Sequence, residues 1–151
     1  MSMDQFSSEC ISLVSYDKIY NQNIRPKLEE IDIYLKSSIP PYNAYELAPL
    51  LEVQPSQVLG AMKELRISVV NQVSFFHLIF HLSSPICQLI KRQWRYSHLT
   101  TYTPYHIADI YQINIHKVTK AFEELDIESI EVSRLHEVFK RIHTTLLFFH
   151  R

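Results

Sequence analysis

Glycine is nearly absent from this sequence. Gly60 is the one glycine among 151 residues, where average usage would give about ten. Glycine serves tight hairpins, bulges and phosphate-binding loops, so its scarcity argues against β-meanders and glycine-rich nucleotide sites. Helices need glycine least. The composition therefore predicts an all-α fold, and the 46% apolar and 21% charged fractions are those of a packed globular domain.

Long apolar segments and paired cysteines are lacking as well. The stretch near Phe75 to Phe80 is interrupted by His77, and nothing is long enough to span a bilayer. No charged-then-apolar signal pattern is visible at the N-terminus. Cys10 and Cys87 have no CxxC companion, so each is expected to be a buried or idle thiol. We therefore expect a cytoplasmic protein with no membrane partner.

Motifs that carry catalysis are also missing. The sequence has no nucleophile elbow, P-loop, HExxH motif or paired carboxylates in an apolar setting. His77 and His81 share one face of an expected buried helix, and His136 and His143 are spaced along the last one, but no further ligand follows at suitable spacing. We expect packed or hydrogen-bonded histidines, no metal, no cofactor and no enzyme activity; a metal-sensing regulator is the alternative.

Charge of either sign is not in excess, since 15 basic and 16 acidic residues give a net charge of -1. A protein that coats nucleic acid without regard to sequence is usually strongly basic. The charge is nevertheless uneven: residues 85–121 carry five lysines and arginines against Asp109, whereas residues 122–137 carry six acids against Arg134. This distribution leaves room for one basic face.

What the sequence does contain is an internal repeat. Residues 42–67 align without a gap on residues 102–127, and eight of the 26 pairs are identical. The identical pairs are Tyr42/Tyr102, Tyr45/Tyr105, Ala48/Ala108, Val58/Val118, Ala61/Ala121, Glu64/Glu124, Leu65/Leu125 and Ile67/Ile127. The matched positions are mostly apolar, as expected when two segments solve one packing problem. We interpret the match as a duplication.

Further helices are expected around each copy. One runs from about Pro26 to Lys36, and another begins at Ser84-Pro85, where a capping residue precedes proline. Apolar residues recur at helical spacing after Ile67 and after Ile127. The sequence therefore predicts an N-terminal arm at residues 1–22, a first unit at 23–83 and a second unit at 84–151. The apolar LLFF segment at 146–149 is expected to enter the core or meet another subunit.

Each copy contains two short apolar-periodic helices separated by three or four residues. Ala48 and Ala108 provide the small residue where such helices cross. Val53 and Ile113 are apolar turn residues. Val58 and Val118 of the second helix are expected to pack against the first helix. Pro55 suits the first position of the second helix, and Asn114 suits an N-cap.

This pattern, best seen in ELAPLLEVQPSQV, resembles the helix-turn-helix superfamily of DNA-binding proteins over about 20 residues in each copy. The resemblance implies tandem helix-turn-helix or winged-helix-like units at 23–83 and 84–151, with short wing strands possible because residues 67–73 include four β-branched residues. One departure is the turn position, where Glu52 and Gln112 replace the usual glycine. A non-glycine residue there costs on the order of 1 kcal/mol, so an altered turn geometry is expected.

In that superfamily the second helix enters the major groove of double-stranded DNA. Carried over residue by residue, the outward positions of the first copy are Ser56, Gln57, Gly60 and Lys63. Those of the second copy are Asn114, His116, Lys117, Lys120 and Glu123. The second copy is better suited to contact DNA, because its outward side chains offer amide, imidazole and ammonium groups for base edges and phosphates. Lys91, Arg92 and Arg95 are expected to point outward and to suit either phosphates or solubility, while Trp94 joins the core.

The sequence thus predicts a sequence-specific DNA-binding regulator of transcription with two tandem helix-turn-helix units. A homodimer would suit the reading of two half-sites. The alternative is a non-enzymatic adaptor or inhibitor that uses degenerate helix-turn-helix units to bind a protein partner. The near-zero net charge favours that alternative, and so does the scarcity of DNA-contacting groups on the second helix of the first copy.

Overall fold

The computed structural model describes the backbone of residues 9–149 and the side chains of residues 13–144. The chain is mostly helical, which confirms the expected fold class at this level. It forms two compact units, one from residues 23–98 and the other from residues 9–22 together with 99–149. We call them the middle unit and the terminal unit.

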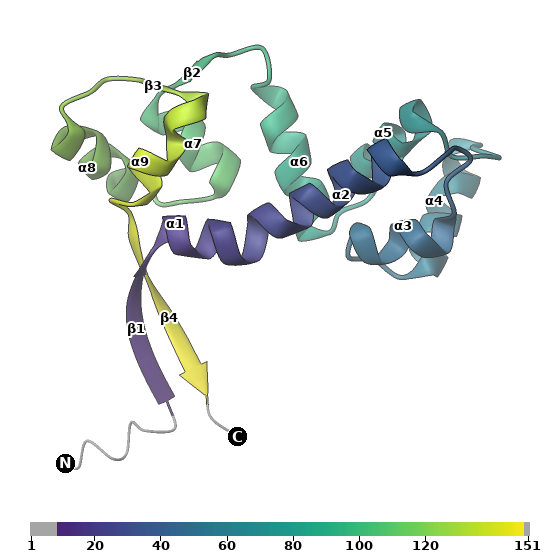
Figure 1. The fold of residues 1–151 in the computed structure, drawn as a ribbon, viewed down its shortest axis with the longest axis horizontal. Coiled ribbons are helices and arrows are strands. Elements are labelled where there is room, and N and C mark those ends of the chain that lie inside the picture. The colour runs from purple at the N-terminus through teal and green to yellow at the C-terminus, as the bar shows by residue number, and fades with distance from the viewer. Residues whose placement is uncertain (1–8, 150–151) are drawn as a thin grey trace. The chain divides into compact units, whose positions relative to one another are not determined.

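The middle unit is entirely helical apart from one isolated bridge (Figure 1). Its helices are α2 (Arg25–Ser37), α3 (Ala44–Leu50), α4 (Pro55–Leu65), α5 (Gln72–His81) and α6 (Pro85–Arg95). Helix α3 packs on α4, α4 on α5, and α5 on α6. The Ser84 hydroxyl caps α6 by accepting from the Cys87 amide, and it donates to the Leu51 carbonyl at 2.6 Å. The expected cap at Ser84-Pro85 is therefore confirmed.

The terminal unit combines short helices with two small antiparallel sheets (Figure 1). In chain order it contains β1 (Glu9–Ser15), α1 (Tyr16–Ile19), the π-helical turn η2 (Tyr20–Ile24) that leads into the middle unit, β2 (Thr101–Tyr102), α7 (Pro104–Tyr111), α8 (Ile115–Leu125), β3 (Ile130–Glu131), the 3-10 turn η3 (Val132–Arg134), α9 (Leu135–Phe139) and β4 (His143–Phe149). Strand β1 pairs with β4, with Ser15 opposite His143, and β2 pairs with β3.

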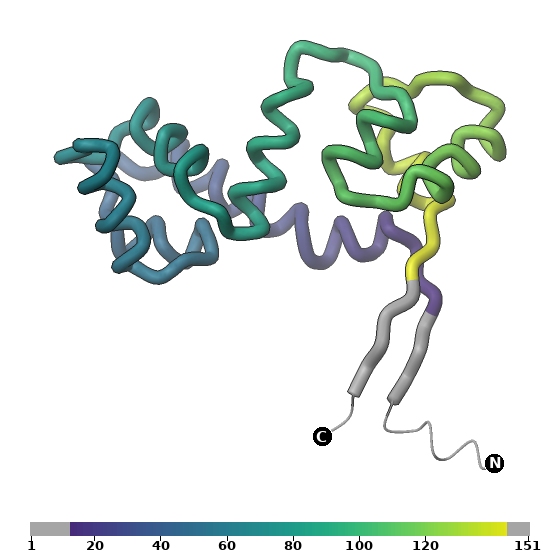
Figure 2. The backbone as a smooth tube through the Cα atoms, turned by 180° about the vertical axis from the view of Figure 1, so that it is seen from behind, coloured from purple at the N-terminus to yellow at the C-terminus, as the bar shows by residue number. Residues whose placement is uncertain are grey.

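The same local structure recurs in both units in the register of the sequence repeat. We call two residues equivalent when they align in that register, which places Tyr42 on Tyr102. Helices α3 and α4, blue in Figure 2, and helices α7 and α8, green, are each joined by a short turn. Tyr42 bridges to Val70, and the equivalent Tyr102 pairs with Ile130. Fully buried equivalent pairs form the two cores: Leu47/Ile107, Val58/Val118 and Leu78/Val138.

The turn between the two helices keeps the left-handed backbone that the sequence argued against. Glu52 has φ 57° and Gln112 has φ 54°. The next amide bonds back to the preceding helix in both units, from Val53 to the Ala48 carbonyl at 3.0 Å and from Ile113 to the Ala108 carbonyl at 3.2 Å. The expectation of an altered turn is therefore wrong. These closing hydrogen bonds outweigh a steric cost on the order of 1 kcal/mol.

The division into units differs from the boundary expected at Ser84. Helix α6 belongs to the middle unit, because its buried residues Ile86, Cys87 and Leu89 pack there with α5. The segment expected to be an arm contains β1 and α1, and the Tyr16 and Tyr20 rings lie 4.8 and 5.2 Å from the Phe139 ring. The LLFF backbone pairs with β1, while its side chains lie outside the described residues.

Among the described residues, no single helix is long and apolar enough to cross a membrane. Helices α5 and α6 meet the length and composition criteria together, but the pair is bent by 108°.

Candidate nucleic-acid interface

Helix α8 is held by its N-cap and by one buried stripe. The Asn114 side-chain oxygen accepts from the His116 amide at 2.8 Å, which confirms the expected cap. Val118, Ala121 and Phe122 are buried. His116, Lys117 and Lys120 therefore fall on the exposed side of the first two turns, and Lys117 and Lys120 lie on one face because they are three residues apart.

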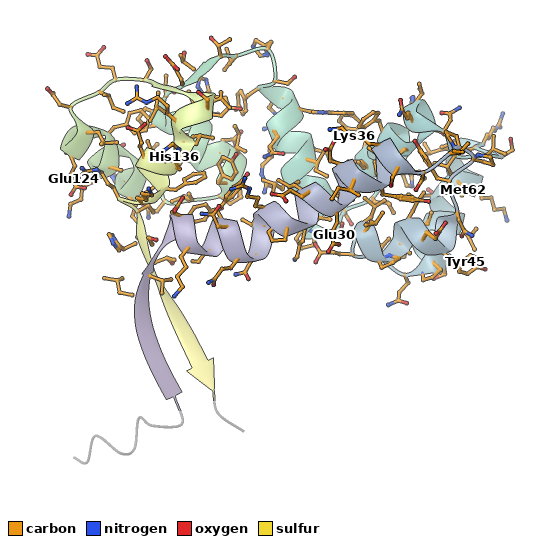
Figure 3. All side chains as sticks on the ribbon, in the orientation of Figure 1. Glu30, Lys36, Tyr45, Met62, Glu124 and His136 are labelled. Atoms are coloured by element: carbon orange, nitrogen blue, oxygen red, sulfur yellow. The ribbon has the colours of Figure 1, made fainter. Side chains whose placement is uncertain are left out.

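Two basic residues that the sequence alone did not indicate lie beside this face. Lys117 Nζ donates to the His143 carbonyl at 2.9 Å. Lys117, Lys120, Arg141 and His143 surround a hollow of about 230 Å³, which we call the α8 basic cluster. Glu124, labelled on α8 in Figure 3, also lines the hollow, and its Oε1 lies 3.8 Å from Arg141 Nη1.

The N-terminus of α8 carries positive charge as well, although its first two residues do not line the hollow. The exposed amides at a helix N-terminus give that end a partial positive charge, and Lys117 and Lys120 stand in the first half of α8. The acids Glu123 and Glu124 stand in its second half, near the negative end. The basic end of α8 therefore suits an anionic group such as a phosphate.

The repeat could have revealed Arg141. Its equivalent in the middle unit is His81, whose Nε2 lies 2.8 Å from Glu64 Oε2 on α4. The Arg141–Glu124 pair repeats that contact in the terminal unit. The recognisable sequence match ends at Ile67 and Ile127, so His81 and Arg141 lie beyond it.

The corresponding face of α4 has little positive charge. Gln57 is occupied by helix capping, since its Oε1 accepts from the Gln54 amide at 2.8 Å. Gly60 faces open space, and a Cβ at this position would meet no neighbouring atom within 4 Å. Lys63 is exposed in the last turn. The structure thus keeps Gln57 and Lys63 at the surface but gives them no cationic neighbourhood like that of α8.

The basic residues of α6 belong to the middle unit. Lys91 was expected to point outward; it is only half-exposed, because its Nζ donates to the Leu82 carbonyl at 2.7 Å, at the end of α5. Arg92 and Arg95 lie in the last turn of α6, with Arg95 exposed and Arg92 half-exposed.

Trp94 was expected in the core, but it lies at the edge of the core and is half-exposed. Its ring contacts Phe76 and Phe80 of α5, with ring centroids 4.4 and 5.1 Å apart. The indole therefore covers one side of α5 instead of filling the interior.

No protein-family model, curated protein or solved structure matches this chain.

Two other kinds of site have little support in the part of the chain that the structure describes. No group of three or more metal-ligating side chains occurs there. Burial raises the pKa of the Cys87 thiol, and the side chain is fully buried, so it is a poor nucleophile. The strongest grouping of chemically capable side chains there is therefore the α8 basic cluster.

Proposed function

We propose that the chain is a sequence-specific DNA-binding regulator of transcription, built from tandem helix-turn-helix units, in which α8 reads the major groove. Lys117, Lys120 and Arg141 hold phosphates, and Asn114 and His116 face base edges. The observation that carries the proposal is that two exposed lysines of α8 and Arg141 line one hollow, where three cationic side chains face the single acid Glu124.

Comparison of equivalent positions strengthens the proposal. Helices α4 and α8 occupy equivalent positions, yet the terminal unit carries more positive charge at and beside the hollow. The changes from middle to terminal unit are Ser56/His116, Gln57/Lys117, Gly60/Lys120, Phe80/Lys140, His81/Arg141 and Ser83/His143. Two changes at the far end of the helix go the other way, Lys63/Glu123 and Arg66/Asp126, and farther along the chain acids replace uncharged or neutral residues at Ser68/Glu128, Asn71/Glu131 and His77/Glu137. The middle unit folds without these charges, so folding does not require them. Binding of an anion is therefore a reason for their presence in the terminal unit.

The first test measures binding of a labelled random-sequence DNA duplex by fluorescence anisotropy over a range of salt concentrations. The double variant K117E/K120E is expected to lose binding, because two phosphate contacts become repulsive. Lys120→Gln alone should reduce the magnitude of the slope of log affinity against log salt concentration by about one. This is the change expected when one phosphate contact, and the counterion that it releases, is lost.

The control is the double variant Q57E/G60E, which places glutamates at the equivalent positions of α4, where the replaced residues are neutral. Glutamate at position 57 retains an oxygen for the Gln54 amide, and a side chain at position 60 meets open space. This variant is expected to bind DNA as the wild type does. Equal losses in the two double variants would contradict the assignment to α8.

Sequence specificity is tested by selecting binding sites from the random duplex pool. A shared motif that the wild type enriches and K117E/K120E does not enrich would support a regulator. If the wild type retains no DNA at low salt, the proposal fails and the protein-binding adaptor becomes the better hypothesis.

A further inference from the structure

Helix α5 is apolar on the side that faces solvent as well as on the side that faces the core. Phe75, Leu78 and Ile79 are buried. The outer stripe consists of Val73, Phe76, His77 and Phe80, spaced as neighbours on one helical face. Val73 is 67% exposed and Phe80 is 53% exposed. An exposed apolar stripe of this kind is typical of an interaction surface.

The terminal unit provides an internal comparison for this stripe. The equivalent positions there are Ser133, His136, Glu137 and Lys140. Glu137 accepts two hydrogen bonds from Arg134, at 2.6 and 2.8 Å, and the Arg134 hydrogen bonds lower the pKa of this carboxyl. The terminal unit thus folds with polar residues at these positions, two of which flank the shorter helix α9. In the middle unit Phe76 and Phe80 contact Trp94 on one side, and the exposed part of the stripe has no such counterpart in the terminal unit.

The stripe lies in the least charged part of the chain. Residues 67–90 contain no aspartate, glutamate, lysine or arginine, although 21% of the whole sequence is charged. Lys91 and Arg95 line a hollow with Phe80 at one end of the stripe. Along the stripe itself a charged partner surface would leave its charges unpaired, whereas a second copy presents another uncharged apolar stripe. Charge complementarity therefore favours a second copy over a charged partner.

The stripe is also complementary to itself in shape. Near Val73 lies a hollow of about 300 Å³, lined by Leu65, Ile67, Asn71, Val73, Ser74 and His77. Phe80 projects from the other end of the stripe, two helical turns or about 10 Å away. If two copies of α5 pair in antiparallel fashion about an axis near His77, each Phe80 meets the hollow beside Val73 of the other copy.

From this geometry we infer that the chain forms a two-fold symmetric homodimer through antiparallel contact of the outer stripes of α5. The dimer goes beyond the proposed DNA contact and does not depend on it, since the α8 basic cluster belongs to the other unit. With one basic reading helix in each chain, a dimer would supply the two that a palindromic site requires.

Sedimentation equilibrium of the full chain, without DNA, tests the dimer. The wild type is expected to approach twice the chain mass as concentration rises. The double variant V73S/F80K, which introduces the residues of the equivalent stripe, should weaken association by about tenfold or more, since it brings ammonium groups into an apolar interface. Tyr105→Lys is the control, because it removes a ring that is 64% exposed on α7 and should leave association unchanged.

Cysteine cross-linking tests the arrangement in a C10S background. His77→Cys, beside the axis, is expected to form a disulfide between copies. Val73→Cys is expected not to, because the two copies of that residue would stand about 10 Å apart along the helices, beyond disulfide reach. Circular dichroism checks that each variant folds.

A wild type that stays monomeric at all concentrations would overturn the dimer, as would a dimer that V73S/F80K leaves intact. Stronger cross-linking at position 73 than at position 77 would overturn the antiparallel register. Because these measurements contain no DNA, their failure is distinguishable from loss of the DNA interface, which K117E/K120E reports separately.

Discussion

At the scale of single residues, the left-handed backbone is the clearest common feature of the two units. Among the described residues, Glu52, Arg66, Gln112 and Asp126 have positive φ between 53° and 57° without being glycine. Each ends a helix, where the following amides return to helix carbonyls. The amides of Arg66 and Ile67, for example, donate to the carbonyls of Lys63 and Met62. At these four helix ends the returning hydrogen bonds therefore hold the left-handed conformation although the residue is not glycine, whereas α2, α5 and α6 end at residues with negative φ.

Arg66→Gly is expected to stabilise the protein by about 1 kcal/mol, because glycine adopts the left-handed conformation without a Cβ clash. The free energy of unfolding from urea denaturation is the measurement. Asp126→Gly is the matched control at the equivalent position. Asp126→Gly should raise the free energy of unfolding by less, because aspartate adopts the left-handed conformation more readily than arginine. A decrease in stability for Arg66→Gly would show that the cap geometry is different.

At the scale of elements, the start of α8 joins stability to recognition through one side chain. The Asn114 side-chain oxygen caps the helix through the His116 amide, which leaves the amide nitrogen of the side chain as a hydrogen-bond donor. Both roles must be separated before any loss of DNA binding is assigned to base contact.

Asn114→Ala is expected to lower the free energy of unfolding by about 1 kcal/mol, since it removes the cap, whereas Asn114→Ser should retain most of the stability. Thermal denaturation measures both. If Asn114 also contacts a base, Asn114→Ser will weaken binding to a selected site more than to random DNA. Equal weakening on both duplexes would mean that Asn114 acts only as a cap.

Several elements could be predicted from the sequence because their signals are local. The helix expected from Pro26 to Lys36 is α2, Arg25–Ser37, and Pro55 and Ser84 begin α4 and α6 as expected. Strands β1 and β4 were not predicted, because they come from opposite ends of the chain and no local turn signal joins them. Their pairing depends on tertiary proximity.

At the scale of the whole molecule, the sequence repeat corresponds to similar helix pairs in the two units, with different surfaces. The buried pairs are similar in size and polarity between the units, while exposed pairs such as Gly60/Lys120 and Val73/Ser133 differ in charge or polarity. The repeated positions thus carry a cationic helix face in one unit and an uncharged apolar stripe in the other.

Transfer of the basic residues to the middle unit tests this view of the molecule. The double variant Q57K/G60K reproduces the Lys117 and Lys120 positions on α4. It is expected to raise affinity for random DNA and to increase the salt slope by up to about two, because new phosphate contacts release more counterions. Glycine replacement inside a helix should also raise stability slightly. Unchanged affinity would indicate that α4 is not presented to DNA.

The sequence by itself determined the helical class, the repeat interval and the caps, because each depends on residues close together along the chain. It also placed Lys117 and Lys120 on an exposed helix face, since the buried stripe fixes the opposite side. Only the tertiary structure brought Arg141 and His143 to that face, joined Lys91 to the Leu82 carbonyl at the end of α5, and assigned α6 to the middle unit. Such outcomes depend on packing between distant segments, and hydrophobic burial specifies no partner until the chain has folded.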